Sequence, residues 1–287
     1  MKVVIIYNPN STGDSKKNAK NLAKELRTYN VPVETLETTH AGHGEEIAAD
    51  YATKKEEIIL ISSSGDGGYH EVVNGALTSK KSKLIVGVLA SGNANDHESA
   101  LGSGKLAESI RDKKFRSIDT IKVSAKIKGK KWERYAHSYV GIGVTAVAAK
   151  RLTEDRPNLL TEKWIVAHSL FSFNYAKLKV NGDNQRYSSI IFGNIDRMSK
   201  VMTLSEGASV TDGKFEMSSI RFRSKLQLLF YLLTAATKGL KDSKSMKKFT
   251  CVTVRPLPIQ LDGEVYTIGA GSKIKITSVK QNLHCVI

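Results

Sequence analysis

Short, wholly apolar runs alternate with helical patterns through the first third of the sequence. Residues 3–7, 58–62 and 84–89 form such runs, and a further short strand is expected at residues 33–37. Strands that are buried on both faces lose the polar alternation of a half-exposed strand, as in parallel sheets covered by helices. Apolar residues recur at helical spacing between the runs, in residues 16–29, 45–52 and 71–77. The alternation predicts a doubly wound parallel sheet.

The sequence changes its period near residue 120. The second half contains short runs of period two joined by turn signals such as Asn181-Gly182-Asp183, which is typical of a hairpin. Strands are expected at residues 121–127, 134–139, 177–180, 187–194, 215–221, 250–254, 259–261 and 274–278, with helical insertions at 144–152, 162–173 and 225–238. We therefore predict an α/β domain at residues 1–122 and a β domain at 123–280. We expect the final strand, at about residues 280–287, to return to the first domain.

The chain is strongly basic. Its 287 residues include 44 Lys and Arg against 28 Asp and Glu, a net charge of +16. Such an excess favours an anionic partner, which can be nucleic acid, an acidic membrane surface or a phosphorylated substrate, although an ordinary basic protein remains the alternative. No aromatic and basic pattern of the common nucleic-acid modules is present, so we expect no nucleic-acid partner.

No apolar segment reaches the length of about 20 residues that a spanning helix needs. The N-terminal run is too short for a signal peptide, and Cys251 and Cys285 lie far apart at no metal-binding spacing. We expect a cytoplasmic protein whose two cysteines are reduced core residues.

One turn stands out between a predicted strand and a predicted helix. It reads Ser62-Ser63-Ser64-Gly65-Asp66-Gly67-Gly68. Glycines at this position let backbone amides approach a phosphate, and the start of a helix carries a partial positive charge. Asp66 would repel a phosphate unless it holds a magnesium ion between them. The alternative is a simple tight turn in which Asp66 caps the helix.

A second polar loop follows the next predicted strand. It contains Gly92, Asn93, Asn95 and Asp96. The carboxyl ends of parallel strands meet at one edge of a sheet, where open α/β sheets bind ligands. The amides of this loop are therefore candidate ligand contacts and Asp96 is a second candidate near a phosphate, unless the loop is only an Asx turn before a helix.

Several segments, in the same order along the chain, resemble the diacylglycerol kinase catalytic family, which includes bacterial lipid kinases and is similar to the sphingosine kinases. The block from Gly65 to Gly75 resembles the family's Gly-Asp-Gly-Thr and Asn-Glu-Val-Val-Asn-Gly pattern. Matching segments are Asn8-Pro9-Asn10-Ser11-Thr12-Gly13, Thr38-Thr39, Gly92-Asn93-Ala94-Asn95-Asp96, Asp119, Ser209-Val210-Thr211-Asp212-Gly213-Lys214-Phe215 and Leu261-Asp262-Gly263-Glu264. The resemblance extends from residue 8 to residue 264.

The resemblance implies a first domain that binds ATP and a second domain that is a β-sandwich. A lipid hydroxyl, such as that of diacylglycerol, would enter the interdomain cleft and attack the γ-phosphate to give a phospholipid such as phosphatidic acid. Asp262 or Glu264 would accept the hydroxyl proton, and Asp66 would act at the phosphates.

The resemblance also implies the ligands of the nucleotide and of magnesium. Nucleotide contacts would come from Asn8, Asn10, Ser11, Thr12, Thr39, Ser64, Gly65, Asp66, Gly67, Gly68, Glu71, Gly92, Asn93 and Asn95. Asp66, Asp96 and Asp119 would organise the catalytic Mg²⁺. Ser209, Asp212 and Lys214 would hold a structural Mg²⁺, with Lys214 giving its main-chain carbonyl because an ammonium cannot bind a cation.

Two positions depart from the family pattern. Gly68 and Asn93 stand where the family has threonine. The alternatives are therefore an NAD or metabolite kinase of the same superfamily, or a weakly active paralogue that binds nucleotide or lipid. A lipid kinase would work at a membrane surface, and the lysines of residues 126–132 and 238–248 would contact anionic lipids there. The sequence allows a homodimer and requires none.

Overall fold

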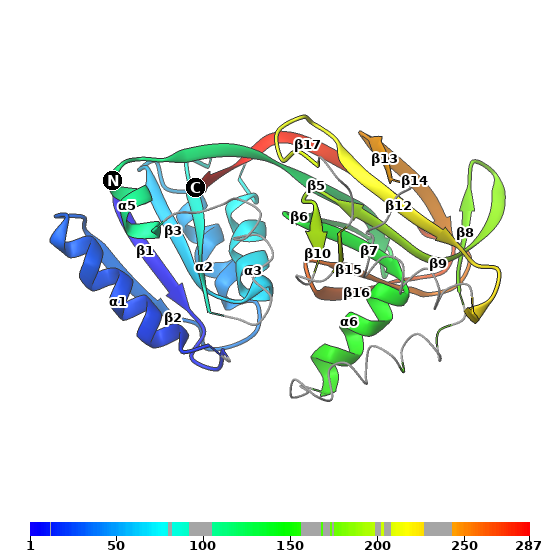
Figure 1. Ribbon diagram of the computed structural model, residues 1–287, viewed down its shortest axis with the longest axis horizontal. Coiled ribbons are helices and arrows are strands. Elements are labelled where there is room, and N and C mark those ends of the chain that lie inside the picture. The colour runs from blue at the N-terminus through cyan, green and yellow to red at the C-terminus, as the bar shows by residue number, and fades with distance from the viewer. Residues whose placement is uncertain are drawn as a thin grey trace. The chain divides into compact units, whose positions relative to one another are not determined.

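The computed structural model describes residues 1–11, 13–79, 82–91, 105–155, 168, 173, 175–198, 202–203, 208–226 and 243–287. The chain divides into two compact units (Figure 1). The first comprises Met1–Thr120 with Lys280–Ile287, and the second comprises Ile121–Val279. Each unit is built round its own apolar core.

The first unit alternates strands and helices. Its elements are β1 (Lys2–Tyr7), α1 (Ser15–Thr28), β2 (Val33–Glu37), α2 (His43–Ala52), β3 (Ile58–Ser64), α3 (Asp66–Ala76), β4 (Ile85–Ala90) and α5 (Leu106–Arg111), followed by the first residues of β5 (Phe115–Ile127) and completed by the end of β17 (Lys273–Val286). The strands pair in the order β2-β1-β3-β4-β17, and every pairing is parallel. The parallel sheet predicted from the apolar runs is present.

Helices cover both faces of this sheet (Figure 1). Val3, Ile5, Ile59 and Ile61 share one core cluster with the apolar stripe of α1 and with α5. Their sequence neighbours point to the opposite face, where α3 contacts β3 and β4 and packs on α2. Helix α1, which follows β1, and helix α3, which follows β3, therefore leave the sheet on opposite faces. In an open parallel sheet, this reversal between adjacent strands opens a crevice at their carboxyl ends, where ligands bind.

Helices α2 and α3 approach each other closely at Gly75. A Cβ at this position would lie 2.3 Å from the main-chain oxygen of Glu45 and 2.6 Å from Cβ of Ala48. We expect Gly75→Ala to lower the free energy of unfolding by about 2 kcal/mol, because overpacking outweighs the better helix propensity of alanine. Denaturant unfolding measures the change. In the control Gly269→Ala, the nearest atom is 3.8 Å away, and an equal loss in both variants would contradict the packing argument.

The second unit is built mainly from strands. Its elements are the rest of β5, β6 (Lys130–Ala136), β7 (Tyr139–Gly143), α6 (Val144–Asp155), β8 (Ala176–Val180), β9 (Asp183–Gly193), β10 (Arg197–Met198), β11 (Met202–Thr203), β12 (Phe215–Arg221), β13 (Ser243–Met246), β14 (Lys248–Thr253), β15 (Leu257–Leu261), β16 (Glu264–Ile268) and the first part of β17. The registers determined within this unit are antiparallel, as the period-two pattern predicts.

The β-sandwich prediction did not specify how the strands are joined. The described strands of this unit, apart from the small pair β10-β11, are linked by hydrogen bonds into one sheet, with β16 and β6 at the two ends of its main path and the pair β12-β13 branching from β9. Trp132 on β6 nevertheless contacts Tyr266 on β16, with ring centroids 4.9 Å apart. The sheet therefore curls until its two ends meet round a single core, as large twisted sheets tend to do. Phe192, Phe215 and Phe249 form the aromatic centre of that core.

Some predicted element boundaries were wrong. Residues 134–139, expected as one strand, are divided between β6 and β7 by a bend at His137 and Ser138. The helix expected from residue 71 begins at Asp66, directly after β3. The predicted helix at 144–152 is present as α6, whereas the insertions at 162–173 and 225–238 lie almost wholly outside the described residues.

Both cysteines are core residues, as predicted. Cys251 is 1% exposed and Cys285 is fully buried. Burial raises the pKa of each thiol to about 12, and in Cys285 the hydroxyl of Tyr69 offsets part of that rise. Within the described part of the chain, no helix combines the length and the apolar character needed to cross a membrane.

Candidate functional site

The N-terminus of α3 is the centre of the candidate site in the first unit. Strand β3 ends at Ser64, Gly65 is the N-cap of the helix, and Asp66 is its first residue. Gly65 adopts φ −83° and ψ −172°, and no side chain caps the helix. The amide groups of the first turn have no acceptor within the helix, and together with the helix dipole they favour an anion. Asp66 is thus not the helix cap that the alternative interpretation required.

Ser91 links the loops that surround this helix start. Its side chain lies just beyond β4 and the residue is 3% exposed. Its hydroxyl lies 3.2 Å from that of Ser63 and accepts a hydrogen bond from Asn18 Nδ2 at 2.9 Å. Its carbonyl accepts from the Ser11 hydroxyl at 2.6 Å. The loop after β1, the start of α1, the end of β3 and the residue after β4 are therefore joined by hydrogen bonds at one edge of the sheet.

The loop after β1 is fixed by its own backbone and by β3. The Asn8 carbonyl accepts from the Ser11 amide at 3.1 Å and from the Ser15 hydroxyl, and the Asn8 side chain accepts from the Asn10 amide at 2.9 Å. Ser63 donates its hydroxyl to the carbonyl of Ser15 at 2.8 Å. Asn8 and Asn10 are exposed. The predicted residues Asn8, Asn10 and Ser11 therefore lie in the loop bound to the end of β3.

Glu71 is engaged in a contact that the sequence did not suggest. Its two carboxylate oxygens accept hydrogen bonds from the amides of Gly42 and Gly44, at 2.8 and 3.0 Å. The loop before α2 is thereby held against α3. Thr39 lies in that loop, where its amide donates to His43 Nδ1 at 3.1 Å. We therefore expect Glu71 to affect a nucleotide through the position of this loop.

The remaining predicted nucleotide residues cannot all be placed. Thr12, Gly92, Asn93, Asn95 and Asp96 lie outside the described residues. Their predicted roles stay predictions.

Asp119, predicted as a magnesium residue, has a structural contact. It is fully buried, and its Oδ1 accepts a hydrogen bond from the amide of Gln281 at 2.7 Å. Gln281 has φ +47°, a left-handed conformation that is unfavourable for a glutamine. The Asp119 carboxylate therefore stabilises the turn by which β17 enters the first unit.

A magnesium nucleotide needs few protein ligands. Mg²⁺ at such sites is bound by one or two carboxylates together with phosphates and water. In the described part of the chain, no three His, Cys, Asp or Glu side chains gather as a metal cage. Asp66, at a helix start that no side chain caps, fits a site in which one or two carboxylates bind Mg²⁺ together with phosphates and water.

The predicted structural magnesium segment forms a turn. Asp212 Oδ1 accepts a hydrogen bond from the amide of Lys214 at 2.9 Å, which is the geometry of an Asx turn. The hydroxyl of Ser209 lies 3.3 Å from that of Thr211. An Asx turn accounts for the contact of Asp212, and the ion itself stays a prediction.

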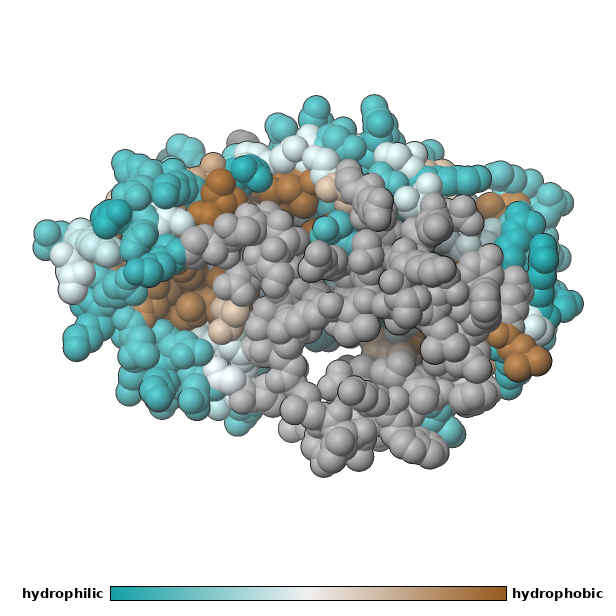
Figure 2. All heavy atoms as spheres, viewed as in Figure 1, coloured by the Kyte–Doolittle hydropathy of each residue, from teal (hydrophilic) through white to brown (hydrophobic). Residues whose placement is uncertain are grey.

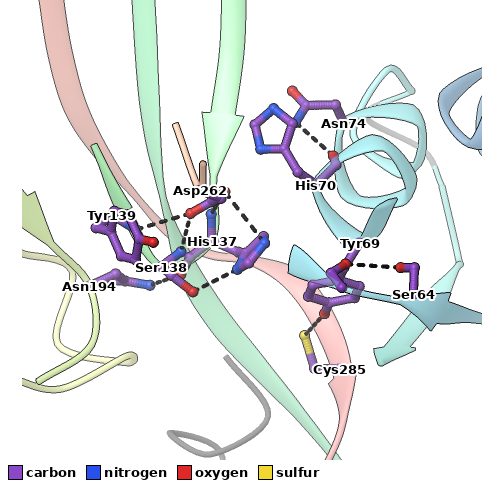
Figure 3. A network of polar contacts seen from close by, with 11 residues as sticks. Ser64, Tyr69, His70, Asn74, His137, Ser138, Tyr139, Asn194, Asp262 and Cys285 are labelled. Carbon is purple, nitrogen blue, oxygen red and sulfur yellow. Dashed lines mark hydrogen bonds and ion pairs between the residues drawn. The ribbon is translucent and has the colours of Figure 1, made fainter. Parts of the chain in front are cut away.

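Asp262 lies at the centre of a buried network in the second unit (Figure 3). The residue is 1% exposed, and its carboxylate accepts hydrogen bonds from the amides of His137, Ser138 and Tyr139 at 3.0, 2.9 and 3.0 Å. His137 Nε2 lies 3.4 Å from the same carboxylate. Asp262 thus fixes the bend between β6 and β7, a role that the sequence did not reveal.

Glu264 occupies the other end of the same turn. Leu261 pairs with Glu264, and the two residues between them, Asp262 and Gly263, have φ +49° and +97°. Two successive left-handed residues are the signature of a tight hairpin turn. Glu264 is partly exposed, whereas Asp262 is buried and hydrogen-bonded. Of the two predicted bases, Glu264 has the more accessible carboxylate.

Several residues of the site escaped the sequence prediction. Ser63, Ser91 and Asn18 connect the loops of the first unit, and His137 belongs to the Asp262 network. The run of three serines at the end of an apolar strand was the one local signal. The contacts themselves join residues that are distant in the sequence. Asp262 and His137, for example, are 125 residues apart.

The first unit and its loops match known proteins. Residues 2–123 match the family model described as diacylglycerol kinase catalytic domain. A diacylglycerol kinase of Bacillus subtilis strain 168 is 34% identical over 128 residues, which are 42% of this chain and 41% of that relative. The matched segment thus spans about two fifths of the length of the curated relative.

Solved structures resemble the whole chain at lower identity. A diacylglycerol kinase from Bacillus anthracis strain Sterne superposes with a TM-score of 0.68 at 17% identity, covering 99% of this chain and 96% of that one. A second structure from the same organism gives 0.74 at the same identity and coverage. Yeast NADH kinase complexed with NADH gives 0.53 at 10% identity, covering 100% of this chain and 83% of that one. These likenesses establish the fold alone.

The family predicted from the ordered motifs is therefore the one that the comparisons find. The matched segment contains the loop after β1, the start of α3 at Asp66, and Asp119. Over residues 2–123, the chain is similar to the diacylglycerol kinase catalytic domain family.

Proposed function

We propose that this protein is an ATP-dependent lipid kinase that transfers the γ-phosphate of ATP to the hydroxyl of diacylglycerol or a related lipid. The observation that carries the proposal is the uncapped start of α3. There, the amide groups of the first turn have no acceptor within the helix, and the turn begins with Asp66 beside the crevice expected at the carboxyl ends of β1 and β3. That crevice is where an open parallel sheet binds a nucleotide.

The chemistry requires positioning and charge neutralisation more than covalent catalysis. The amides at the start of α3 would bind the phosphates, and Asp66 would hold the Mg²⁺ of the nucleotide. Bound Mg²⁺ would neutralise charge on the phosphates. The lipid oxygen attacks the γ-phosphorus as its proton passes to the Glu264 carboxylate, and the bond to the bridging oxygen breaks to release ADP. Asp262 holds the turn on which Glu264 lies.

Transfer of labelled phosphate tests the proposal. Purified protein is given γ-labelled ATP, Mg²⁺ and mixed micelles of diacylglycerol, monoacylglycerol, a sphingoid base or phosphatidylglycerol, with NAD in a parallel tube. Label in the lipid fraction supports the proposal. Label in NAD alone would assign the metabolite kinase, the alternative that the sequence left open.

We also propose that a lysine-rich hollow in the second unit contacts anionic lipids. The hollow, of about 820 Å³, lies between the tip of the β5-β6 hairpin and the turn from β16 to β17. Its lining includes Lys126, Lys128, Lys131, Lys273 and Lys275. Lys131 pairs with Glu133 at 3.3 Å, and the other four have no acidic group of the described residues within ion-pair distance. The described surface in Figure 2 is largely hydrophilic, with separate apolar areas. Because lysines line the hollow, charge is expected to drive this contact.

Neutralising the hairpin tip should weaken membrane binding. Each lysine near an anionic leaflet contributes about 1 kcal/mol, so the double change Lys126→Gln and Lys128→Gln should weaken binding to phosphatidylserine vesicles about 30-fold. Vesicle sedimentation at fixed ionic strength measures the affinity. The control, Lys20→Gln with Lys24→Gln on the exposed face of α1, removes the same charge. Equal losses in both variants would show that net charge alone binds the vesicle.

A further inference from the structure

The side chain of Ser64 occupies the space that a side chain at position 68 would need. A Cβ at Gly68 would lie 2.5 Å from Ser64 Oγ and 2.6 Å from Ser64 Cβ. Gly68 is in the first turn of α3, and its φ is outside the left-handed region. The backbone would therefore accept another residue, and it is the serine that excludes one.

The Ser64 hydroxyl is held in a defined position at the start of α3. It donates to the carbonyl of Gly65 at 2.9 Å and lies 2.7 Å from the hydroxyl of Ser62. If Ser64 donates to Gly65, then Ser62 donates to Ser64. Ser64 is 4% exposed and Ser62 is 1% exposed, so this pair is shielded from bulk water on the strand side of the helix start.

We infer that Ser64 supplies, from the end of β3, a hydroxyl that binds phosphate at the start of α3, and that Gly68, where the family pattern has threonine, leaves the room for it. Ser64 and Gly68 form an exchanged pair, in which the hydroxyl has moved to the strand and the helix has lost its side chain to make room. When a phosphate binds, the Ser64 proton turns from the Gly65 carbonyl to a phosphate oxygen, while Ser62 keeps Ser64 Oγ in place. The inference rests on the proposed nucleotide site.

The exchanged pair changes the effect on ATP binding that is expected of Gly68. From the sequence, the missing threonine suggested a weakened site, and restoring it by Gly68→Thr would be expected to tighten ATP binding. The structure gives the opposite expectation, because a threonine beside Ser64 would place atoms closer than 3.0 Å. The hydroxyl should be restored only when both positions change together.

Calorimetric titration of ATP and Mg²⁺ into four variants tests the exchange. Loss of a hydrogen bond to a charged phosphate should make Ser64→Ala bind ATP about tenfold or more weakly. Gly68→Thr should also bind weakly and melt at a lower temperature. The double variant Ser64→Gly with Gly68→Thr should recover ATP binding to within a few-fold of the wild type. Ser109→Ala, another buried serine of the first unit, is the matched control and should bind like the wild type.

Two results would overturn the exchange. The first is wild-type ATP affinity in Ser64→Ala, and the second is a double variant that binds no better than Gly68→Thr. Thermal melts identify a variant that has lost its fold. If Ser64→Ala has lost its fold, the ATP affinity of the double variant is compared with that of Gly68→Thr, and this comparison tests the exchange. A wild-type protein that binds no ATP at all would overturn the proposed function together with the exchange. ATP binding that is insensitive to Ser64 overturns the exchange alone.

Discussion

Replacing Glu264 by Gln is expected to lower kcat for phosphate transfer by about 10²- to 10⁴-fold, the usual contribution of a general base. Glutamine keeps the size and shape of the side chain but cannot accept the proton of the lipid hydroxyl. The affinity for ATP and the melting temperature should stay near those of the wild type, because Glu264 is partly exposed at the start of β16.

A second glutamate provides the control. Glu216 is also partly exposed, in strand β12 of the same unit, and lies outside the Asp262-Gly263 turn. Steady-state rates with saturating ATP and lipid are compared for Glu264→Gln and Glu216→Gln. A wild-type rate in Glu264→Gln would remove this residue as the base.

Replacing Asp262 by Ala is expected to lower the free energy of unfolding by about 3–5 kcal/mol. The change would leave three buried amides, those of residues 137–139, without the acceptor that now holds them. It would also place alanine at φ +49°, where only glycine, asparagine and aspartate are readily accommodated. Urea unfolding, followed by the fluorescence of the two tryptophans and by circular dichroism, measures the loss.

Asn at position 262 separates the two causes of that loss. Asparagine tolerates the left-handed turn and keeps one acceptor oxygen. We expect Asp262→Asn to lose about half as much stability as the alanine variant. The surface control Asp183→Ala, at the exposed start of β9, should change little. An alanine variant as stable as the wild type but inactive would contradict the structural role and make Asp262 the base.

The fold of the first unit could be predicted because its information is local. Continuous apolar runs such as Ile58 to Ile61 are buried on both faces, and the stripe of α1 faces the core. Boundaries were less certain where two signals compete. The glycines of 65–68 predicted a loop, yet the helix already begins at Asp66, directly after its N-cap Gly65.

The second unit shows what local patterns cannot specify. The hairpins at Asn181-Gly182 and Asp262-Gly263 follow from residues that favour left-handed turns, and both are present. The curling of one sheet onto itself depends on Trp132 meeting Tyr266, which are distant in sequence. The strand predicted at 134–139 was wrong because the bend at His137 depends on Asp262, a partner far along the chain.

Residue type and motif order predicted which residues belong to the candidate site. They did not predict which contacts those residues make. Motif order identified Asp66, Ser64 and Glu264 as candidates, but not that Glu71 holds the loop before α2 or that Asp119 holds the turn at Gln281. Each of these carboxylates has its partner set by tertiary packing. Gly68 is the clearest case, since its meaning depends on the side chain of Ser64 four residues earlier.

Transfer of the γ-phosphate to a lipid hydroxyl tests the central claim most directly. Wild type and Glu264→Gln are incubated with γ-labelled ATP, Mg²⁺ and micelles of either diacylglycerol or triacylglycerol, which has no free hydroxyl. The account predicts labelled phosphatidic acid from the wild type with diacylglycerol only, and a rate at least a hundredfold lower in Glu264→Gln, about the smallest effect expected for a lost base. Wild-type protein that binds ATP and labels none of the lipid acceptors, or that labels NAD instead, would contradict it.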